Sequence, residues 1–204
     1  MSVRVKICGV TRTEDVDAAV SLGADMIGLN FYEKSKRYVS EERAKQLARA
    51  IPRSVWRVGV FVNSSREEVE ALRTAVGLDV IQFHGDEPSE IVRNWPCPVI
   101  RATRLATEAD VDRVLASPQA DYLLCEGTAG GGYGGGGETF DWRWASRLPA
   151  DRLFVAGGIV PENVAEAVRG LRPFAVDVAS GVEVSPGVKD PAKMKELIQN
   201  AKAA

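Results

Sequence analysis

The stretch that decides the fold is Val3-Arg4-Val5-Lys6-Ile7-Cys8-Gly9, close to the start of the chain. Its alternating β-branched residues predict a strand that stops at a thiol and a glycine. The following residues predict a helix, because Thr13 opens an acidic first turn and Gly23 stands where a helix commonly ends. The segment is therefore a strand-to-helix unit, with Cys8 at the turn between its two elements.

The same order of strand and helix recurs along the chain. Residues 26–31 are almost all apolar, which is typical of a strand buried on both faces. Ser40 and Ser65 are predicted N-caps of the next two helices, and Pro161 is predicted at the first position of a later one. Six more strands are predicted at residues 57–62, 79–83, 98–102, 122–125, 153–156 and 174–178.

Eight such units predict a parallel sheet closed on itself, which is the (β/α)8 TIM barrel of the α/β class. We expect residues 1–204 to form this single domain. An open doubly wound sheet is the alternative, but no GxGxxG motif follows the first strand to support it.

Composition narrows the classes of partner. A net charge of −2, from 26 basic and 28 acidic residues, argues against binding to nucleic acid or to an anionic membrane, because both usually require a basic surplus. No apolar run has the length of a membrane span, and the first strand takes the place of a signal-peptide core. We therefore expect a cytoplasmic protein with a small-molecule partner, either a monomer or a homodimer.

The cysteine and histidine content argues against metal and disulfide chemistry. Cys8, Cys97 and Cys125 are odd in number and show no CxxC spacing. His84 is the single histidine, so a transition-metal site is not expected.

Reactive side chains follow the predicted strands. In a (β/α)8 barrel the chemistry gathers at the carboxyl ends of the strands. The residues at these ends, together with the loop after the second strand, are Cys8, Asn30, Arg37, His84, Arg101, Glu126, Gly157, Gly158, Asp177, Ser180 and Gly181.

The last two units carry a candidate phosphate site. Gly157 with Gly158 and Ser180 with Gly181 follow the seventh and eighth strands, where barrels commonly bind phosphate through backbone N–H groups. The alternative is that both pairs are only tight turns. The glycine-rich residues 127–137 lack the Lys-Ser/Thr of a nucleotide-binding loop, and we expect them to form a flexible cover over the site.

Several segments carry a family resemblance that runs through the whole chain. Together they resemble the phosphoribosylanthranilate isomerase family. These segments are KICG at 6–9, SKRYV at 35–39, VGVF at 58–61, QFHGDE at 82–87, FDW at 140–142, AGGI at 156–159 and ASGVE at 179–183.

The resemblance implies an enzyme of tryptophan biosynthesis that works without metal or organic cofactor. Its reaction is the Amadori rearrangement of N-(5-phosphoribosyl)anthranilate to 1-(2-carboxyphenylamino)-1-deoxyribulose 5-phosphate. The resemblance makes Cys8 the general base and places Arg37 at the anthranilate carboxylate. His84 and Asp177 are implied to line the substrate site.

The general acid departs from the family pattern, because Glu126 stands where an aspartate is usual. A carboxylic acid with an ordinary pKa of about 4.3 and a thiol with one of about 8.5 are both in the wrong protonation state near neutrality. We therefore expect the site to raise the pKa of Glu126 and to lower that of Cys8.

Two other functions remain open at this point. A different sugar-phosphate barrel is one, although a related isomerase would favour two carboxylates and an epimerase would need metal-binding histidines. A barrel that binds a phosphoribosyl ligand without catalysis is the other, and the departure at Glu126 keeps it open.

Overall fold

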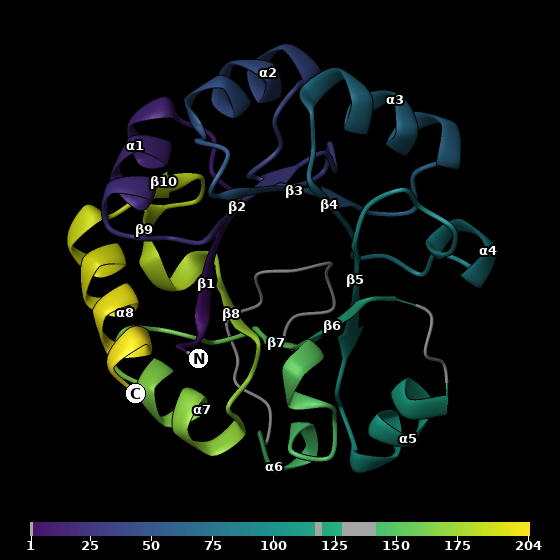
Figure 1. Ribbon diagram of the computed structural model, residues 1–204, viewed down its shortest axis with the longest axis vertical. Helices are drawn as coiled ribbons and strands as arrows, with labels where there is room; N and C mark the ends of the chain where they lie inside the picture. Colours follow the sequence, from purple (N-terminus) through teal and green to yellow (C-terminus); the bar gives the residue numbers. More distant parts are fainter. Residues whose placement is uncertain (1, 117–119, 128–141) are drawn as a thin grey trace.

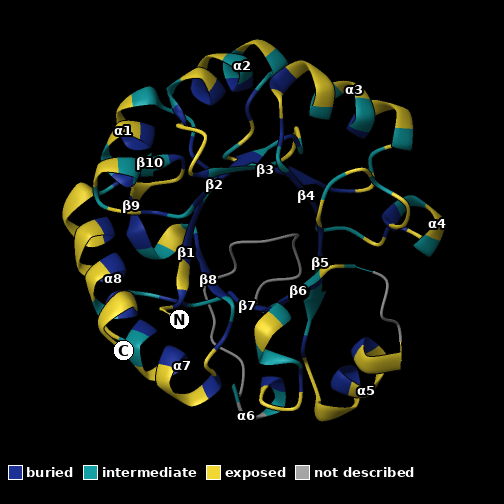
Figure 2. Cartoon of the chain, in the orientation of Figure 1, coloured by how far each residue is buried: buried dark blue, intermediate teal, exposed yellow. Residues whose placement is uncertain are grey.

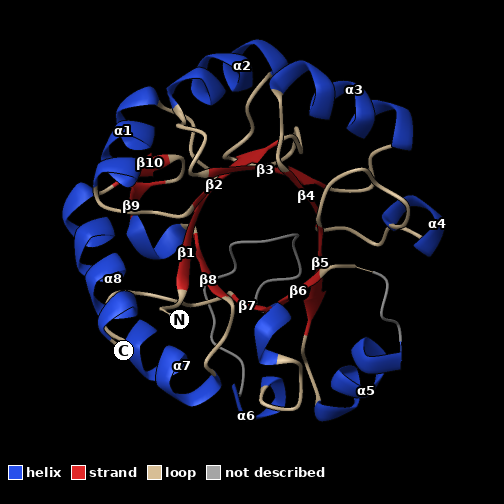
Figure 3. Cartoon of the chain, in the orientation of Figure 1, coloured by secondary structure: helices blue, strands red, loops and turns tan. Residues whose placement is uncertain are grey.

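The computed structural model describes residues 2–116, 120–127 and 142–204. Figure 3 shows the strands as a closed ring with the helices outside it. Neighbouring strands pair in parallel in sequence order, and the first strand closes the ring against the eighth through the pairs Arg4–Ala175 to Ile7–Val178. The predicted TIM barrel is therefore confirmed.

Figure 1 labels the elements along the chain. The barrel strands are β1 (Arg4–Cys8), β2 (Met26–Asn30), β3 (Trp56–Phe61), β4 (Val80–Phe83), β5 (Val99–Arg104), β6 (Tyr122–Glu126), β7 (Leu153–Val155) and β8 (Ala175–Val178). The helices are α1 (Thr13–Ser21), α2 (Glu41–Ala50), α3 (Arg66–Val76), α4 (Ser89–Val92), α5 (Glu108–Ala116), α6 (Trp142–Ala145), α7 (Val164–Leu171) and α8 (Pro191–Ala203). After β8 come the 3-10 turn η3 (Ser180–Val182) and an antiparallel pair, β9 (Glu183–Ser185) and β10 (Val188–Lys189); η2 (Ala150–Arg152) precedes β7.

The predicted helix signals have mixed outcomes. Ser40 and Ser65 cap α2 and α3 as expected, each accepting a hydrogen bond from a backbone N–H three residues later. Pro161 does not start a helix, because α7 begins at Val164 with Asn163 at its N-cap. The predicted helix after β4 ends at Val92 and does not reach Trp95, because the backbone is already extended at Arg93, with φ −87° and ψ 162°.

The core has two layers. The larger lies between the strands and the helices, whose inner faces are buried and outer faces exposed (Figure 2). The smaller fills the barrel itself with side chains such as Met26, Val58, Ile100 and Leu124. The barrel is thus a packed core, and chemistry in this fold takes place beyond the ends of its strands.

Candidate active site

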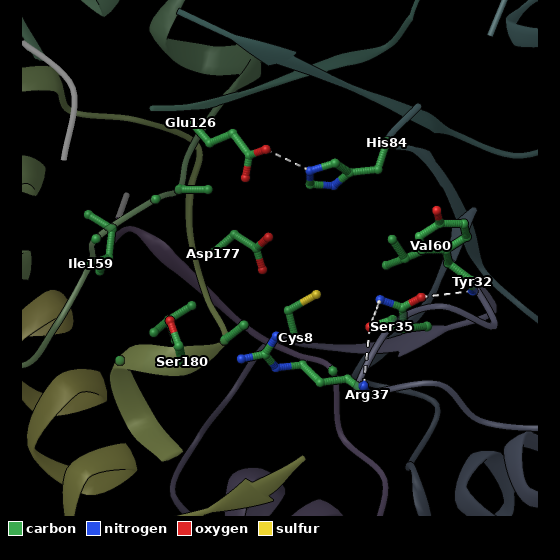
Figure 4. A pocket seen from close by; sticks show the side chains of 18 of the residues that line it. Cys8, Tyr32, Ser35, Arg37, Val60, His84, Glu126, Ile159, Asp177 and Ser180 are labelled. Atoms are coloured by element: carbon green, nitrogen blue, oxygen red, sulfur yellow. Dashed lines mark hydrogen bonds and ion pairs between the residues drawn. The ribbon is translucent and has the colours of Figure 1, made fainter. Parts of the chain in front are cut away.

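A pocket lies at the carboxyl ends of the strands and collects most of the predicted site residues (Figure 4). Its walls come from the ends of β1, β2, β3, β6 and β8 and from the residues that follow β2, β3, β4, β7 and β8. The predicted residues that line it are Cys8, Asn30, Arg37, His84, Glu126, Gly157, Gly158, Asp177, Ser180 and Gly181. Arg101 is not among its lining residues; its Nη1 lies 3.3 Å from Oε2 of Glu87.

Cys8 ends β1 with its side chain on the wall of this pocket. Gly28 on the neighbouring strand makes room for it, because a Cβ there would lie 2.9 Å from Sγ of Cys8. Burial raises the pKa of the Cys8 thiol, and the charge of Asp177 adds to this effect; Lys6 and Lys189 oppose it without reversing it. The expectation that the site lowers the pKa of Cys8 is therefore wrong.

Glu126 ends β6 and points into the same pocket (Figure 4). Its Oε1 lies 2.9 Å from Nε2 of His84 and 3.7 Å from Nε of Arg104. Burial alone would raise the pKa of Glu126, but the hydrogen bond and charge of His84, with Arg104, outweigh it and hold the pKa below its ordinary value. The expected rise in the pKa of Glu126 is thus also wrong.

Arg37 reaches the pocket from the loop after β2. Its Nε and Nη2 donate to Oε1 and Oε2 of Glu183 at 2.8 Å and 2.7 Å, and this pairing raises the pKa of Arg37. Gly9 permits the approach, since a Cβ at that position would lie 2.4 Å from Cδ of Arg37. This pair uses two of the five N–H donors of the guanidinium group, so Nη1 and the second hydrogen of Nη2 can still donate to an anion in the pocket.

The two glycine turns form one continuous wall. Gly157 and Gly158 have φ values of 74° and 65°, which favour glycine, and Asn163 braces this turn by donating from Nδ2 to the carbonyl of Gly158 at 2.8 Å. A Cβ at Gly181 would lie 2.0 Å from the carbonyl oxygen of Ile159. The loops after β7 and β8 therefore pack directly on each other, and their backbone borders a single recess beside Ser180.

Three further expectations concern a loop over the site, metal ions and membrane spans. The predicted cover at residues 127–137 lies outside the described residues except for Gly127. Within the described ranges, no group of three or more His, Cys, Asp and Glu side chains is arranged to hold a metal ion. The described helices also include none with the length and apolar character of a membrane span.

The sequence model of the N-(5'-phosphoribosyl)anthranilate (PRA) isomerase family matches residues 5–200. The chain belongs to this family. A curated PRA isomerase from Pseudomonas fluorescens is 45% identical over 199 residues, which cover 97% of this chain and 95% of the relative. One from Myxococcus xanthus is 46% identical and covers 100% of this chain and 98% of its own.

Solved PRA isomerases have the same architecture. The enzyme from Thermotoga maritima is 42% identical with a TM-score of 0.92, and the match covers 99% of this chain and 100% of that one. A PRA isomerase in complex with reduced 1-(o-carboxyphenylamino)-1-deoxyribulose 5-phosphate is 41% identical with a TM-score of 0.88, at 99% and 100% coverage.

Sequence reasoning gave no role to three buried polar residues around the PRA isomerase pocket. Gln82 is fully buried in β4. Glu183 and Lys189 are joined at 2.9 Å, and Nζ of Lys189 also donates to the backbone carbonyl of Cys8 at 2.6 Å. Gln82 could have been found from the sequence, because it is a polar residue within an apolar strand. It also precedes His84 by two residues, which places both side chains on the same face of the strand.

Proposed function

We propose that this chain catalyses the reaction of its family, the Amadori rearrangement of N-(5-phosphoribosyl)anthranilate in tryptophan biosynthesis. The observation that carries this assignment is the position of Cys8 and Glu126, which come from different strands and line one pocket with the paired glycine turns. A thiol, a carboxyl group and a backbone recess for phosphate are the groups that the reaction requires.

The reaction needs one proton donor and one proton acceptor. Glu126 donates a proton to the furanose ring oxygen, the bond from that oxygen to C1 breaks, and an iminium ion forms. The thiolate of Cys8 then removes the proton from C2, and the resulting enol-amine becomes the ketone as its enol hydroxyl group loses a proton and C1 gains one. The proton held by Cys8 is exchanged through solvent back to Glu126, which restores the starting form of both groups. The substrate is isomerised without net gain or loss of protons, so no oxidant or reductant is consumed.

The remaining groups hold the substrate. The turns at Gly157–Gly158 and Ser180–Gly181 bind the 5-phosphate through backbone N–H groups, as helix and loop termini do for anions. Arg37 binds the anthranilate carboxylate, which suits a guanidinium group. Asp177 and His84 line the pocket between these two ends.

The pKa shifts indicate how the pair shares its proton. The raised pKa of Cys8 and the lowered pKa of Glu126 favour a neutral thiol and a carboxylate. The reactive form has the same number of protons, with the proton on Glu126 instead of Cys8. Its population is therefore constant at every pH between the two pKa values, and falls below the lower one and above the upper one.

An assay that forms the labile substrate from anthranilate and phosphoribosyl pyrophosphate, and follows the loss of its fluorescence, tests this function. We expect turnover whose kcat/KM is level around neutrality and falls at both extremes of pH. Absence of turnover above background with folded protein would contradict the proposed activity.

We extend the proposal to the molecule as a whole. Residues 1–204 act as one catalytic domain in the cytoplasm, where a phosphorylated substrate is retained, and the partner is this small molecule and no nucleic acid. The protein is a monomer or a homodimer; monomers generated from the dimeric T. maritima enzyme have been solved, with 40% identity and a TM-score of 0.87.

A further inference from the structure

A chain of hydrogen bonds crosses the mouth of the barrel and ends on Glu126. Asp177 Oδ1 accepts from Nζ of Lys6 at 2.9 Å, and Nζ of Lys6 donates to Oε1 of Gln82 at 2.8 Å. Nε2 of Gln82 lies 2.9 Å from Nδ1 of His84, and Nε2 of His84 lies 2.9 Å from Oε1 of Glu126. These side chains are buried from water except for the partly exposed ring of His84, so their partners are fixed by the protein.

Lys6 decides which way the amide of Gln82 faces. An ammonium group has only donors, so the atom of Gln82 at 2.8 Å from Nζ must be its oxygen. Asp177 holds Lys6 in place by an ion pair in which both side chains are buried. The amide nitrogen of Gln82 is thereby directed at His84, and a reversed amide would place two donors against each other.

The orientation of Gln82 in turn decides the tautomer of His84. An amide nitrogen is only a donor, so Nδ1 of His84 must accept its hydrogen bond. The proton of the neutral ring then resides on Nε2, from which it is donated to Oε1 of Glu126. A proton on Nδ1 would face the amide N–H of Gln82, and the arrangement opposes it.

We propose that Gln82 is a positioning residue, oriented by Lys6, that holds His84 as the Nε2–H tautomer and thereby orients the carboxyl group of Glu126. The hydrogen bond from His84 occupies Oε1, and the second carboxyl oxygen faces the middle of the pocket (Figure 4). This second oxygen, Oε2, carries the proton to the substrate. The catalytic part of this inference rests on the proposed acid role of Glu126, whereas the tautomer of His84 does not.

The single histidine of the chain makes the tautomer directly observable. Protein labelled with 15N-histidine gives one imidazole in a long-range 1H–15N NMR correlation spectrum, with no assignment problem. For the wild-type protein above neutral pH, we expect a protonated Nε2 and an unprotonated Nδ1. A ring protonated on Nδ1 would overturn the inference, and this result requires no variant to fold.

Gln82→Glu replaces the amide N–H donor that faces His84 with a carboxylate oxygen and keeps the shape of the side chain. A carboxylate at this position still accepts from Lys6, but it presents only acceptors to His84 and draws a proton to Nδ1. We expect the NMR pattern to change to a protonated Nδ1, and kcat to fall at least tenfold with KM changed less than threefold. An unchanged Nε2–H tautomer would overturn the positioning role, and a changed tautomer with wild-type kcat would overturn its catalytic importance.

Gln82→Met provides the matched control, because it removes both hydrogen bonds at similar volume. We expect a mixture of His84 tautomers and a kcat between those of the wild-type and Gln82→Glu proteins. A pure Nε2–H ring in this variant would show that Gln82 does not set the tautomer.

Wild-type kcat in Glu126→Gln would instead refute the proposed acid role of Glu126. It would leave the NMR result for His84 standing, so the failure of the proposed function and the failure of this inference are distinguishable.

Discussion

The two ends of the barrel are built from the same strands but hold opposite kinds of side chain. β1 begins at Arg4 and ends at Cys8, and β6 begins at Tyr122 and ends at Glu126. At the carboxyl ends, charged and polar groups are buried and paired. At the amino ends, the rings of Trp56, Tyr122, Phe154 and Phe174 pack with centroids 4.6 to 6.2 Å apart.

This difference means that the amino ends of the barrel mainly stabilise the fold, whereas the carboxyl ends mainly serve the chemistry. Apolar contacts tolerate small displacements and stabilise the fold through the area they bury. Buried polar groups contribute little net stability unless each has its partner, but they fix proton positions and orientations. Changes at the carboxyl ends should therefore alter catalysis more than stability, and changes at the amino ends should do the reverse.

The largest expected effect on kcat comes from substituting Cys8, the proposed general base. Replacing Cys8 with alanine should lower kcat by more than about a hundredfold, because loss of an acid or base typically costs on the order of 10²–10⁴ in rate. The fluorescence assay measures this effect. Cys97→Ala is the matched control, since Cys97 is partly buried outside this pocket, and it should keep kcat within twofold. A Cys8→Ala enzyme of near-normal rate would remove Cys8 from the base role.

Substituting Glu126, the proposed general acid, is expected to lower kcat almost as much. Glu126→Gln should lower kcat by more than about a hundredfold, since it keeps the shape but removes the acidic proton. Glu126→Asp withdraws the carboxyl group from His84 by roughly one bond, and a shift on the order of 1 Å can cost about a hundredfold in rate. We expect kcat of Glu126→Asp to fall between tenfold and a hundredfold. A rise in kcat would show that the site is not built around glutamate.

Changes to the recess between the two glycine turns, which we propose to bind phosphate, should affect KM more than kcat. Gly181→Ala places a methyl group against the carbonyl of Ile159 and must separate the two turns. We expect KM to rise about tenfold with a smaller change in kcat, because bound substrate still meets Cys8 and Glu126. Gly170→Ala, in α7 with open space at its Cβ, is the control and should stabilise the fold by about 0.5 kcal/mol. Equal KM values for the two variants would count against a phosphate site there.

The smallest effect, a change in stability, is predicted at the amino ends of the barrel strands. The guanidinium group of Arg4 lies 5.0 Å from the ring centre of Trp56 and 4.7 Å from that of Phe174. Arg4→Ala should lower the free energy of unfolding, measured in urea, by about 0.5–1 kcal/mol while leaving kcat unchanged. Arg4→Lys should recover part of this loss. A change in kcat without a change in stability would contradict the separation between the two ends.

The fold and the membership of the site were largely predictable from the sequence. The eight apolar runs marked the strands, and parallel closure brings all their carboxyl ends to one rim, so Cys8 and Glu126 could be expected together. The end of the helix after β4 was less predictable, because it lies at an extended residue, Arg93, that is neither glycine nor proline. Pro161 carried a helix-start signal, yet a turn precedes α7 at this position.

The electrostatics of the site could not be predicted in the same way. The pKa shifts of Cys8 and Glu126 depend on burial and on partners from other strands, which no local pattern contains. Arg37 finds its partner Glu183 at a separation of 146 residues. Gln82 was recognisable as polar within an apolar strand, but its role appears only once Lys6 and His84 are seen on either side of it.

The most direct test is a crystal structure of this protein with reduced 1-(o-carboxyphenylamino)-1-deoxyribulose 5-phosphate, the ligand already solved with a related enzyme. We predict that the phosphate lies between the turns at Gly157–Gly158 and Ser180–Gly181. Sγ of Cys8 should lie against C2, and Oε2 of Glu126 should be within hydrogen-bond reach of the oxygen derived from the opened ring. A ligand bound with either side chain out of reach of these atoms would contradict the assignment of Cys8 and Glu126 as base and acid.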